Sequence, residues 1–469
     1  MPESAGHTRE QQLVRVQDVV IEHLREHGQE TGANLGHVLR REIPGFSTQD
    51  LGFPSLTRLL QGAADQLVIV GKKGDDWIWA LGESLSDQAL DRALGAEIDP
   101  TTLLNRPPSA LITSVELLRF RSCQEVRLAL AGSGPTALVG PNGSGKSTLL
   151  MGISYASQVT RGRLRALFSG RRDVRRLRTA GDTRPMELAL HAGPTSSLRL
   201  IASPMEEDTQ FEVSFKSGNK RETWRSPGFP PDPPLSARPG SRLYWPSVLL
   251  RFRAEALASP SDVVEGEPKL AFDGGGLPTL LAHLATTDPD RLDALVDSVR
   301  QVVPAVEKTR QTLRRWTPEH WTSPTDGDES RMQYQLDVKV RGNWIPADLL
   351  SEGTLFAFGL HAVLQQRVPP RILLMDDVDR GLHPKAQRAL IQQLNQISAT
   401  GGPQVVISTH SPYMLDELPA DNVRVVRANG NGTQVRSLTA HPDWQEWQAS
   451  MTSGEFWTYV GEEWLEKAP

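Results

Sequence analysis

The first ninety residues carry short amphipathic segments of two different periods. Apolar residues recur at helical spacing in three stretches, 13–24, 34–41 and 55–60. Two apolar runs then flank a glycine-containing loop, at 67–70 and 77–79, and this arrangement predicts a β-hairpin. We therefore expect a small α+β domain over residues 1–90.

From residue 111 onward the pattern changes to short apolar strands separated by helical stretches. A helical pattern over 84–94 and a proline-containing linker over 91–110 precede the change. Strands are expected at 111–117, 126–130, 137–139, 186–191, 198–202, 211–215, 372–375 and 405–407, and helices at 277–284 and 289–303. Six prolines between 227 and 239 predict an irregular surface segment. The alternation predicts an α/β domain, a mixed sheet with helices, over residues 111–469.

Composition narrows the class of protein. The chain has 469 residues, 38% hydrophobic and 23% charged, which is ordinary for a globular protein of two or three domains. Its one cysteine, Cys123, excludes a disulfide framework and a cysteine-rich metal cluster. The polar N-terminus is unlike a signal peptide, and no run approaches the roughly 18 apolar residues that span a bilayer. We expect a cytoplasmic protein with no membrane partner, and a net charge of −5 excludes a uniformly basic coat.

A glycine-rich turn lies between the predicted strand 137–139 and a helix-forming run. Its residues are Gly140, Pro141, Asn142, Gly143, Ser144, Gly145, Lys146, Ser147 and Thr148, which match the pattern G-x-x-x-x-G-K-[ST] in full. Glycines let successive backbone N–H groups curl around a polyphosphate, and the following helix adds its positive end. Lys146 places a charge on the β- and γ-phosphates, and the Ser147 hydroxyl is a ligand for Mg²⁺. The sequence therefore predicts a site for ATP and Mg²⁺.

Polar residues follow two of the other predicted strands. Asp376 and Asp377 end the strand 372–375, and His410 comes shortly after the strand 405–407. Ligands bind at the carboxyl ends of parallel strands in open α/β sheets. We interpret Asp376 as a partner of Mg²⁺, Asp377 as the group that polarises the attacking water, and His410 as a residue near the γ-phosphate. Alone, an aspartate pair or a single histidine is more often structural, so this interpretation depends on the phosphate loop.

Four stretches together resemble the ATP-binding-cassette (ABC) class of ATPases, in its soluble RecF/SMC-like branch. They are residues 140–148, 350–354, 374–384 and 408–412, in the order expected for that class. The resemblance is to the bacterial AAA-21-type, OLD-like group, and it covers roughly residues 111–465. It implies a P-loop NTPase head of ABC type, preceded here by the small N-terminal domain.

The resemblance also implies that ATP joins two heads into a homodimer or a higher homo-oligomer. The phosphate loop of one subunit would face Ser351, Glu352 and Gly353 of the other, which stand at the family's signature loop. His410 would be the switch histidine. Charge developing on the γ-phosphate needs donors on both sides, and a second subunit supplies them.

Several positions depart from the family pattern. The family usually has glutamate where this chain has Asp377, and because aspartate is one methylene shorter we expect slow hydrolysis. Glu352 replaces a frequent glycine, which is common within this branch. The family's Q-loop glutamine has no clear counterpart, and Gln158 is the nearest candidate.

The distance along the chain from Lys146 to Asp376 exceeds what a compact cassette needs, so we expect an insertion at about 160–340. The segment after His410 is too short for the Toprim nuclease domain of some relatives. We therefore expect no nuclease in this chain and a separately encoded effector protein as its partner.

The N-terminal domain shows the winged-helix pattern of three helices closed by a hairpin. Residues 35–39, 43–46, 51–56 and 68–70 resemble the OST-HTH/LOTUS winged helix, a family associated with RNA binding and with protein partners. Residues 1–90 hold 8 Lys and Arg against 13 Asp and Glu, so few cations are available for phosphate contacts. Binding of RNA or DNA and docking of a protein both remain open for this domain.

The strongest basic run lies between Arg161 and Arg184. Its nine arginines are Arg161, Arg163, Arg165, Arg171, Arg172, Arg175, Arg176, Arg178 and Arg184, against only Asp173 and Asp182. Arginine without lysine favours contact with a phosphate backbone. An acidic protein partner and a plain solvated face are the alternatives.

Together these features favour a slow ATPase that dimerises around ATP and couples closure to the sensing of a nucleic acid or a partner. By its resemblance to OLD-like ATPases, its setting would be DNA repair or antiviral defence. The alternative is a nearly inactive ATP-dependent clamp for RNA or protein that controls a separately encoded effector. A nucleotide-binding subunit of a membrane transporter is a third reading, which the winged-helix pattern and the insertion disfavour.

Overall fold

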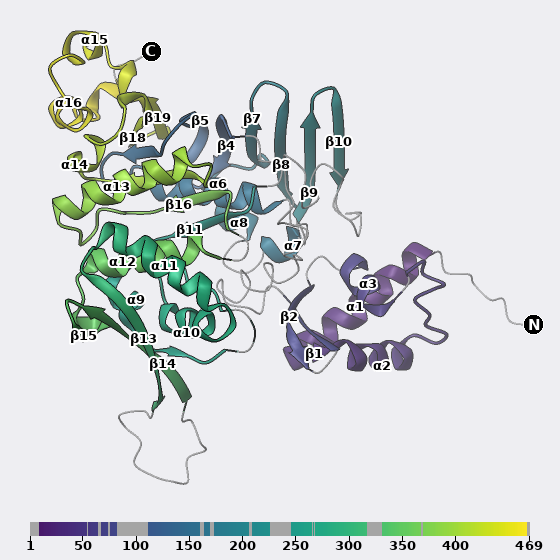
Figure 1. Ribbon diagram of the computed structural model, residues 1–469. Coiled ribbons are helices and arrows are strands. Elements are labelled where there is room, and N and C mark those ends of the chain that lie inside the picture. The colour runs from purple at the N-terminus through teal and green to yellow at the C-terminus, as the bar shows by residue number, and fades with distance from the viewer. Residues whose placement is uncertain are drawn as a thin grey trace, which may run out of the picture. The chain divides into compact units, whose positions relative to one another are not determined.

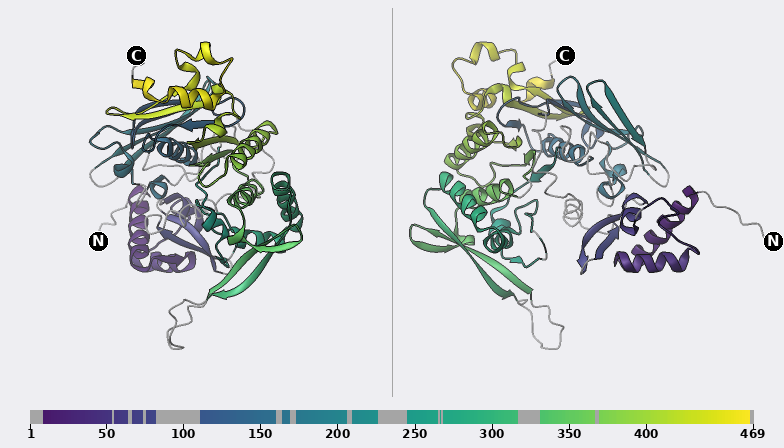
Figure 2. Two further views of the ribbon diagram at one scale, coloured as in Figure 1. Left: turned by 90° about the vertical axis from the view of Figure 1, so that its left-hand side faces the viewer. Right: turned by 45° about the vertical axis from the view of Figure 1, so that its right-hand side comes forward.

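The computed structural model describes most of the chain, and Figures 1 and 2 show its elements. The described residues are 9–53, 55–63, 67–73, 76–81, 111–159, 164–168, 173–205, 209–225, 245–264, 266, 268–316, 331–366 and 369–466. The predicted helix over 84–94 and the linker over 91–110 lie outside them. Two compact units are distinguished: residues 1–125 with 155–245, and residues 126–154 with 246–469.

The N-terminal part of the first unit is a small helical domain with a three-stranded sheet. Its elements are α1 (Arg9–His27), β1 (Gln29–Thr31), α2 (Gly32–Glu42), α3 (Leu56–Ala63), β2 (Leu67–Lys73) and β3 (Asp76–Leu81). The strands are antiparallel in the order β1-β3-β2, and the fully buried Leu24, Leu35, Leu59 and Trp79 form the core. The predicted helices and hairpin are present, and β1 is an addition that the sequence pattern did not indicate, because it is polar and only three residues long.

An antiparallel sheet occupies the rest of the first unit. Its order is β10-β9-β8-β7-β4-β5. The strands are β4 (Ser114–Phe120), β5 (Cys123–Ala129), β7 (Met186–Ala192), β8 (Ser196–Pro204), β9 (Thr209–Ser217) and β10 (Lys220–Arg225), with the short helices α7 (Leu164–Leu167) and α8 (Val174–Leu177). β5 starts three residues before the expected 126–130, because its polar residues alternate with buried ones instead of forming an apolar run.

The main sheet of the second unit has six strands and is mostly parallel. Its order is β11-β16-β17-β6-β18-β19, and only β18 and β19 are antiparallel to each other. The strands are β6 (Thr136–Val139), β11 (Ser247–Leu250), β16 (Ile372–Met375), β17 (Gln404–Thr409), β18 (Val423–Asn429) and β19 (Gly432–Ser437). The strands β16, β17 and β6 are wholly buried, as expected inside a parallel sheet, and the first four residues of β18 are buried as well.

Helices and a smaller sheet complete the second unit. The helices are α6 (Lys146–Gln158), α9 (Ala254–Ala258), α10 (Leu277–Thr287), α11 (Pro289–Val302), α12 (Glu352–Leu364), α13 (Pro384–Ala399), α14 (Pro412–Leu415), α15 (Trp444–Trp447) and α16 (Ser453–Val460), with 3₁₀ turns η4 (Ala347–Leu349), η5 (Ala420–Asn422), η6 (Leu438–Ala440) and η7 (Glu463–Glu466). The sheet consists of β12 (Ser261–Asp262), β13 (Val306–Trp316), β14 (Arg331–Val340) and β15 (Asn343–Pro346), and β13 with β14 forms a long ribbon (Figure 2).

The structure differs from the single insertion expected at about 160–340. Strands β7 to β10, within that range, continue the sheet begun by β4 and β5. Strand β11 pairs in parallel with β16. Strands β7 to β11 are therefore integral to the two main sheets, and the residues from α10 to β15 form a subdomain on one hydrophobic core with the parallel sheet. Within the described part of the chain, no helix is long and apolar enough to cross a membrane.

Candidate nucleotide-binding site

The glycine-rich loop connects β6 to α6, as predicted. Gly140 and Gly145 have φ angles of +146° and +106°, a region that side chains disfavour. A Cβ atom on Gly140 would lie 1.9 Å from the carbonyl oxygen of Val426, and one on Gly145 would lie 2.2 Å from Thr433 Oγ1. The hairpin β18–β19 thus forms a wall directly behind the loop, and only glycine fits at these two positions.

Lys146 begins α6 and folds back over the loop. Its Nζ donates hydrogen bonds to the carbonyl oxygens of Gly140 at 2.8 Å and Pro141 at 3.0 Å, and the residue is 5% exposed. Desolvation by burial lowers the pKa of Lys146, while Asp377 and Asp376 oppose this shift. The ammonium group is therefore poorly compensated by neutral carbonyls, and anionic phosphate oxygens would suit it better.

Ser147 and Asp376 meet at the carboxyl end of the sheet. Ser147 Oγ donates to the two carboxylate oxygens of Asp376, at 2.8 and 3.0 Å. Ser408, at the end of neighbouring β17, donates to Asp376 Oδ1 at 2.6 Å. Asp376 is 5% exposed, so its charge is held by these hydroxyls within a dry setting. The two residues predicted for Mg²⁺ thus lie in direct contact.

The backbone of Asp377 is left-handed, with φ of +49°. Its N–H donates to Ser408 Oγ at 2.8 Å. Its carboxylate forms a close ion pair with the guanidinium of Arg251. Sequence reasoning did not single out Arg251, although it directly follows the apolar residues of β11, the same position that Asp376 has after β16.

His410 follows β17, and its backbone N–H donates to Asp379 Oδ1 at 3.2 Å. Asp379 belongs to the same turn as Asp376 and Asp377, so the structure brings His410 to this cluster of carboxylates. Gln158 instead lies at the opposite end of α6 from Lys146, about 18 Å along a helix of that length. It is too far from the phosphate loop to act there.

Ser351, Glu352 and Gly353 start α12. Ser351 caps the helix, and its Oγ accepts from the Thr354 N–H at 3.3 Å. The carboxylate of Glu352 lies over Gly381, where a Cβ would be 2.1 Å from Glu352 Oε2. Among the described residues, no hydrogen bond connects these three residues with the loop 140–148 of the same chain. The adjacent Leu349 is 73% exposed.

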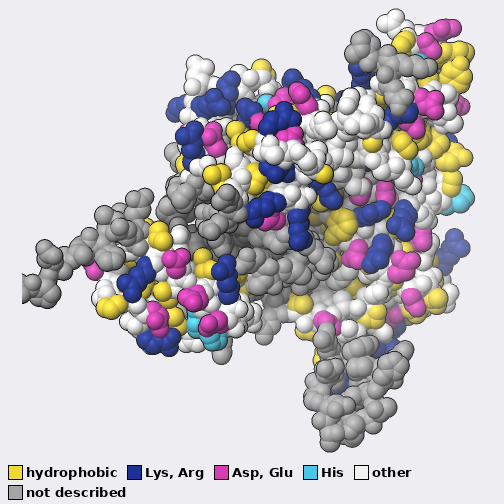
Figure 3. Space-filling model, turned by 180° about the vertical axis from the view of Figure 1, so that it is seen from behind, with side chains coloured by type: hydrophobic (Ala, Val, Ile, Leu, Met, Phe, Trp, Pro, Cys, Tyr) yellow, Lys and Arg dark blue, Asp and Glu magenta, His cyan; other side chains and the backbone are white. Residues whose placement is uncertain are grey.

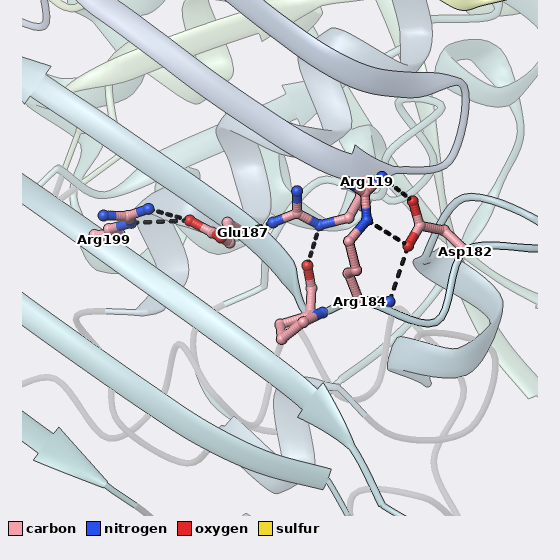
Figure 4. A network of polar contacts seen from close by, with 6 residues as sticks. Arg119, Asp182, Arg184, Glu187 and Arg199 are labelled. Carbon is pink, nitrogen blue, oxygen red and sulfur yellow. Dashed lines mark hydrogen bonds and ion pairs between the residues drawn. The ribbon is translucent and has the colours of Figure 1, made fainter.

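The described arginines of the basic run are largely engaged. Arg184 pairs with Asp182 at 2.7 Å, and the side chains of Arg175 and Arg178 donate to backbone oxygens. Arg176 is exposed. Figure 4 shows Arg184 with Asp182 and the neighbouring network in which Glu187 binds Arg119 and Arg199. Arg161, Arg163, Arg171 and Arg172 lie outside the described residues, as does the side chain of Arg165.

Two further observations bear on nucleic-acid binding. Tyr155 and Phe168 stack in a buried aromatic row with Phe120 and Phe211, so they are core residues without a free face for bases. On the face drawn in Figure 3, basic side chains are interspersed with acidic and apolar ones. This distribution agrees with the net charge of −5.

These features define a P-loop ATPase head. A glycine-rich loop follows a buried parallel strand, and a lysine, a serine and the aspartate at the end of a neighbouring strand surround it. Residues 114–259 match the model of a family described as an AAA domain. Residues 282–416 match a second model, described as an AAA domain, putative AbiEii toxin, Type IV TA system.

The OLD nuclease of Thermus scotoductus is 23% identical over 359 residues, which cover 71% of this chain and 65% of that protein. The two family models and this relative support the resemblance of the ATPase part of the chain to the RecF/SMC-like ABC-class ATPases of the AAA-21/OLD-like group, which the four motifs indicated. The OST-HTH/LOTUS resemblance of the N-terminal domain stays a prediction.

Solved SMC heads are also similar to this chain. An SMC head bound to the C-terminal winged-helix domain of ScpA has a TM-score of 0.46 and 17% identity, over 69% of this chain and 97% of that one. The SMC head domain from Thermotoga maritima has a TM-score of 0.35 and 13% identity, over 70% and 98%.

Proposed function

We propose that this chain binds ATP with Mg²⁺ and hydrolyses it slowly. The observation that carries the proposal is the convergence of Lys146, Ser147 and Asp376, from α6 and β16, on one loop that only glycines can form. A polyphosphate in the loop would replace the carbonyl partners of Lys146 with anionic oxygens. The same charge would be stabilised by the loop's N–H groups and the positive end of α6.

The residues present fit Mg²⁺. Ser147 and Asp376 offer a hydroxyl and a carboxylate, the hard oxygen donors that Mg²⁺ prefers, and they are already in contact. When bound, the ion would neutralise charge on the phosphate oxygens. Asp377 would orient and polarise the attacking water, and His410 would lie near the γ-phosphate.

Dimerisation, or assembly into a higher homo-oligomer, is the second part of the proposal. The start of α12 makes no hydrogen bond with its own phosphate loop within the described residues, and the exposed Leu349 lies beside it. Such a surface suits contact with a second copy, whose phosphate loop Ser351 and Gly353 would face. Two heads closing around ATP would form a two-state device.

We further propose that closure reports on a nucleic acid or a protein partner. The N-terminal domain and the exposed Arg176 are candidates for that contact. By the resemblance to OLD-like ATPases, the setting would be DNA repair or antiviral defence. A solved SMC head is bound to a winged-helix domain of another protein, which supports a protein partner equally well. An effector would be encoded separately, and the ATPase would act in the cytoplasm.

One observation favours the alternative of a nearly inactive clamp. The carboxylate of Asp377 is held in an ion pair by Arg251, so in this state it is not free to orient water. Replacement of Asp377 by glutamate distinguishes the two functions. A rise in turnover supports the slow ATPase, and an unchanged trace rate supports the clamp.

The test is steady-state ATP hydrolysis by the full chain, alone and with single- and double-stranded RNA and DNA, with Lys146→Ala as the blank. We expect slow hydrolysis that the blank lacks. Stimulation by one nucleic acid that Arg176→Glu reduces would name the ligand. A rate that no nucleic acid changes would assign closure to a protein partner, and no binding of ATP would refute the proposal.

A further inference from the structure

Arg251 occupies a position equivalent to that of Asp376 on the neighbouring strand. Strands β11 and β16 are parallel, with Leu250 opposite Met375, so the residues that follow them emerge side by side. The Asp376 N–H donates to the Leu250 carbonyl at 2.8 Å and extends this register by one step. Arg251 therefore belongs to the same carboxyl edge as the two aspartates.

The guanidinium of Arg251 faces both carboxylates. It forms the close ion pair with Asp377, and its Nη1 lies 3.9 Å from Asp376 Oδ2. Its Nε is buried and has no hydrogen-bond partner among the described residues. A buried guanidinium donor without an acceptor is costly, which indicates that the present arrangement leaves one of its five donors for another group.

The backbone around Arg251 is fixed, whereas its side chain is not. The Arg251 N–H donates to Phe272 O at 2.7 Å, and the Arg253 N–H donates to Asp273 O at 2.9 Å. The Arg251 side chain is 39% exposed. Any change of partner must therefore come from side-chain torsions, which move the guanidinium by a few ångströms at small cost.

Asp376, the neighbour of Asp377 in the chain, links Arg251 to the phosphate loop. The Asp376 carboxylate contacts Ser147 Oγ of the loop at 2.8 Å, and Arg251 Nη1 lies 3.9 Å from the same carboxylate oxygen, so the guanidinium is close to the loop. In a loop of this pattern the lysine reaches the β- and γ-phosphates. The terminal phosphate would thus arrive next to the ion pair and compete with Asp377 for the guanidinium.

We propose that Arg251 contacts the γ-phosphate of bound ATP, and that its ion pair with Asp377 holds this carboxylate inactive until ATP arrives. The inference rests on the proposed function, because it assumes ATP in the loop 140–148. A planar guanidinium binds phosphate through two N–H groups. Its departure leaves Asp377 free to polarise water, so the ion pair couples recognition of the third phosphate to activation of the base. ADP lacks the competing group and leaves the pair closed.

The test compares affinities for the magnesium complexes of ADP and of a non-hydrolysable β,γ-imido ATP analogue, by calorimetry on the full chain. Arg251→Ala is expected to weaken binding of the analogue at least tenfold and to change binding of ADP by less than twofold. Arg253→Ala is the matched control, because Arg253 pairs with Asp273 at 2.8 Å and, among the described residues, forms no ion pair with Asp376 or Asp377. It should leave both affinities unchanged. If the alanine variant does not fold, the same two affinities are measured with Arg251→Gln.

Asp377→Asn, which tolerates the left-handed backbone of this position, adds a readout that a merely structural arginine would not affect. With its competitor removed, Arg251 should bind the analogue several-fold more tightly, and this gain should vanish in the double variant with Arg251→Ala. Equal losses for ADP and the analogue, or a gain that persists without Arg251, would overturn the proposal. A wild-type chain that binds neither nucleotide, or a Lys146→Ala variant that binds both normally, would refute the proposed function itself.

Discussion

The hydroxyl of Ser408 donates a 2.6 Å hydrogen bond to the carboxylate of Asp376, across the pair of parallel strands β16 and β17. The same oxygen accepts the Asp377 N–H at 2.8 Å. One fully buried serine therefore holds the orientation of both aspartates, one through its side chain and the other through its backbone.

Ser408→Ala should lower both stability and activity. It removes an acceptor from the Asp377 N–H and a donor from a buried carboxylate, so we expect a loss of about 1–3 kcal/mol in the free energy of unfolding. ATP hydrolysis should fall more than ATP binding. Denaturant unfolding and steady-state turnover measure the two effects. Ser398→Ala is the control, because its buried hydroxyl has no partner among the described residues, and it should cost little.

Gly140→Ala should prevent the loop from forming. A methyl group there would lie 1.9 Å from the backbone oxygen of Val426. A backbone atom cannot move aside by a side-chain rotation. We expect a loss of several kcal/mol and no measurable nucleotide binding. Thermal unfolding and calorimetry with ATP measure this. Gly132→Ala, where the space around the new atom is open, should be close to neutral, and equal effects at both positions would contradict the explanation.

His361 should make the protein less stable in mild acid. Burial lowers its pKa from 6.5 to about 4, and its ring contacts Gln393 in the core. Between these two pH values the unfolded chain binds a proton that the folded chain does not, so stability falls as pH decreases from 6.5 to 4. The loss amounts to roughly 3 kcal/mol. His361→Gln should flatten this part of the stability curve in urea unfolding.

The matched control for His361 is the exposed His37. His37→Gln should retain the wild-type slope between pH 4 and 6.5. A slope that survives in His361→Gln would show that other groups cause the acid sensitivity.

Asp377→Asn should separate binding from hydrolysis. Asparagine tolerates the left-handed backbone of this position about as well as aspartate, so the fold should persist. It cannot act as a base, and we expect ATP binding at least as tight as in the wild type with hydrolysis reduced at least a hundredfold. Light scattering with ATP should then detect a longer-lived dimer. Unchanged turnover would exclude Asp377 from the reaction.

The parts of the site that lie within one short segment could be predicted from the sequence. The residues 140–148 form a complete local pattern, and Asp376 could be found because it directly follows an apolar run. Arg251 could not, since β11 has only four residues and its pairing partner β16 is far away in sequence. Ser408 was part of a predicted motif, but its bridging role depends on strand register.

The fold shows the same limit. The fully buried strands β16 and β17 were predicted at or within their observed bounds, because each has a run of apolar residues that a buried parallel strand requires. The role of residues 160–340 was not predicted, because the sequence pattern does not indicate which sheet a strand joins. Pairing of β7 with β4 and of β11 with β16 made strands β7 to β11 integral to the fold.

The wall behind the phosphate loop comes from Val426 and Thr433, near the far end of the chain from the glycines that it supports. During synthesis, the ribosome would release the whole glycine-lysine segment long before either residue is made. A nascent chain that stops before β18 would thus have every residue of the nucleotide motif and no surface to shape it. Nucleotide would therefore become a ligand only after β18 and β19 have been made, and a head truncated before them should not capture ATP.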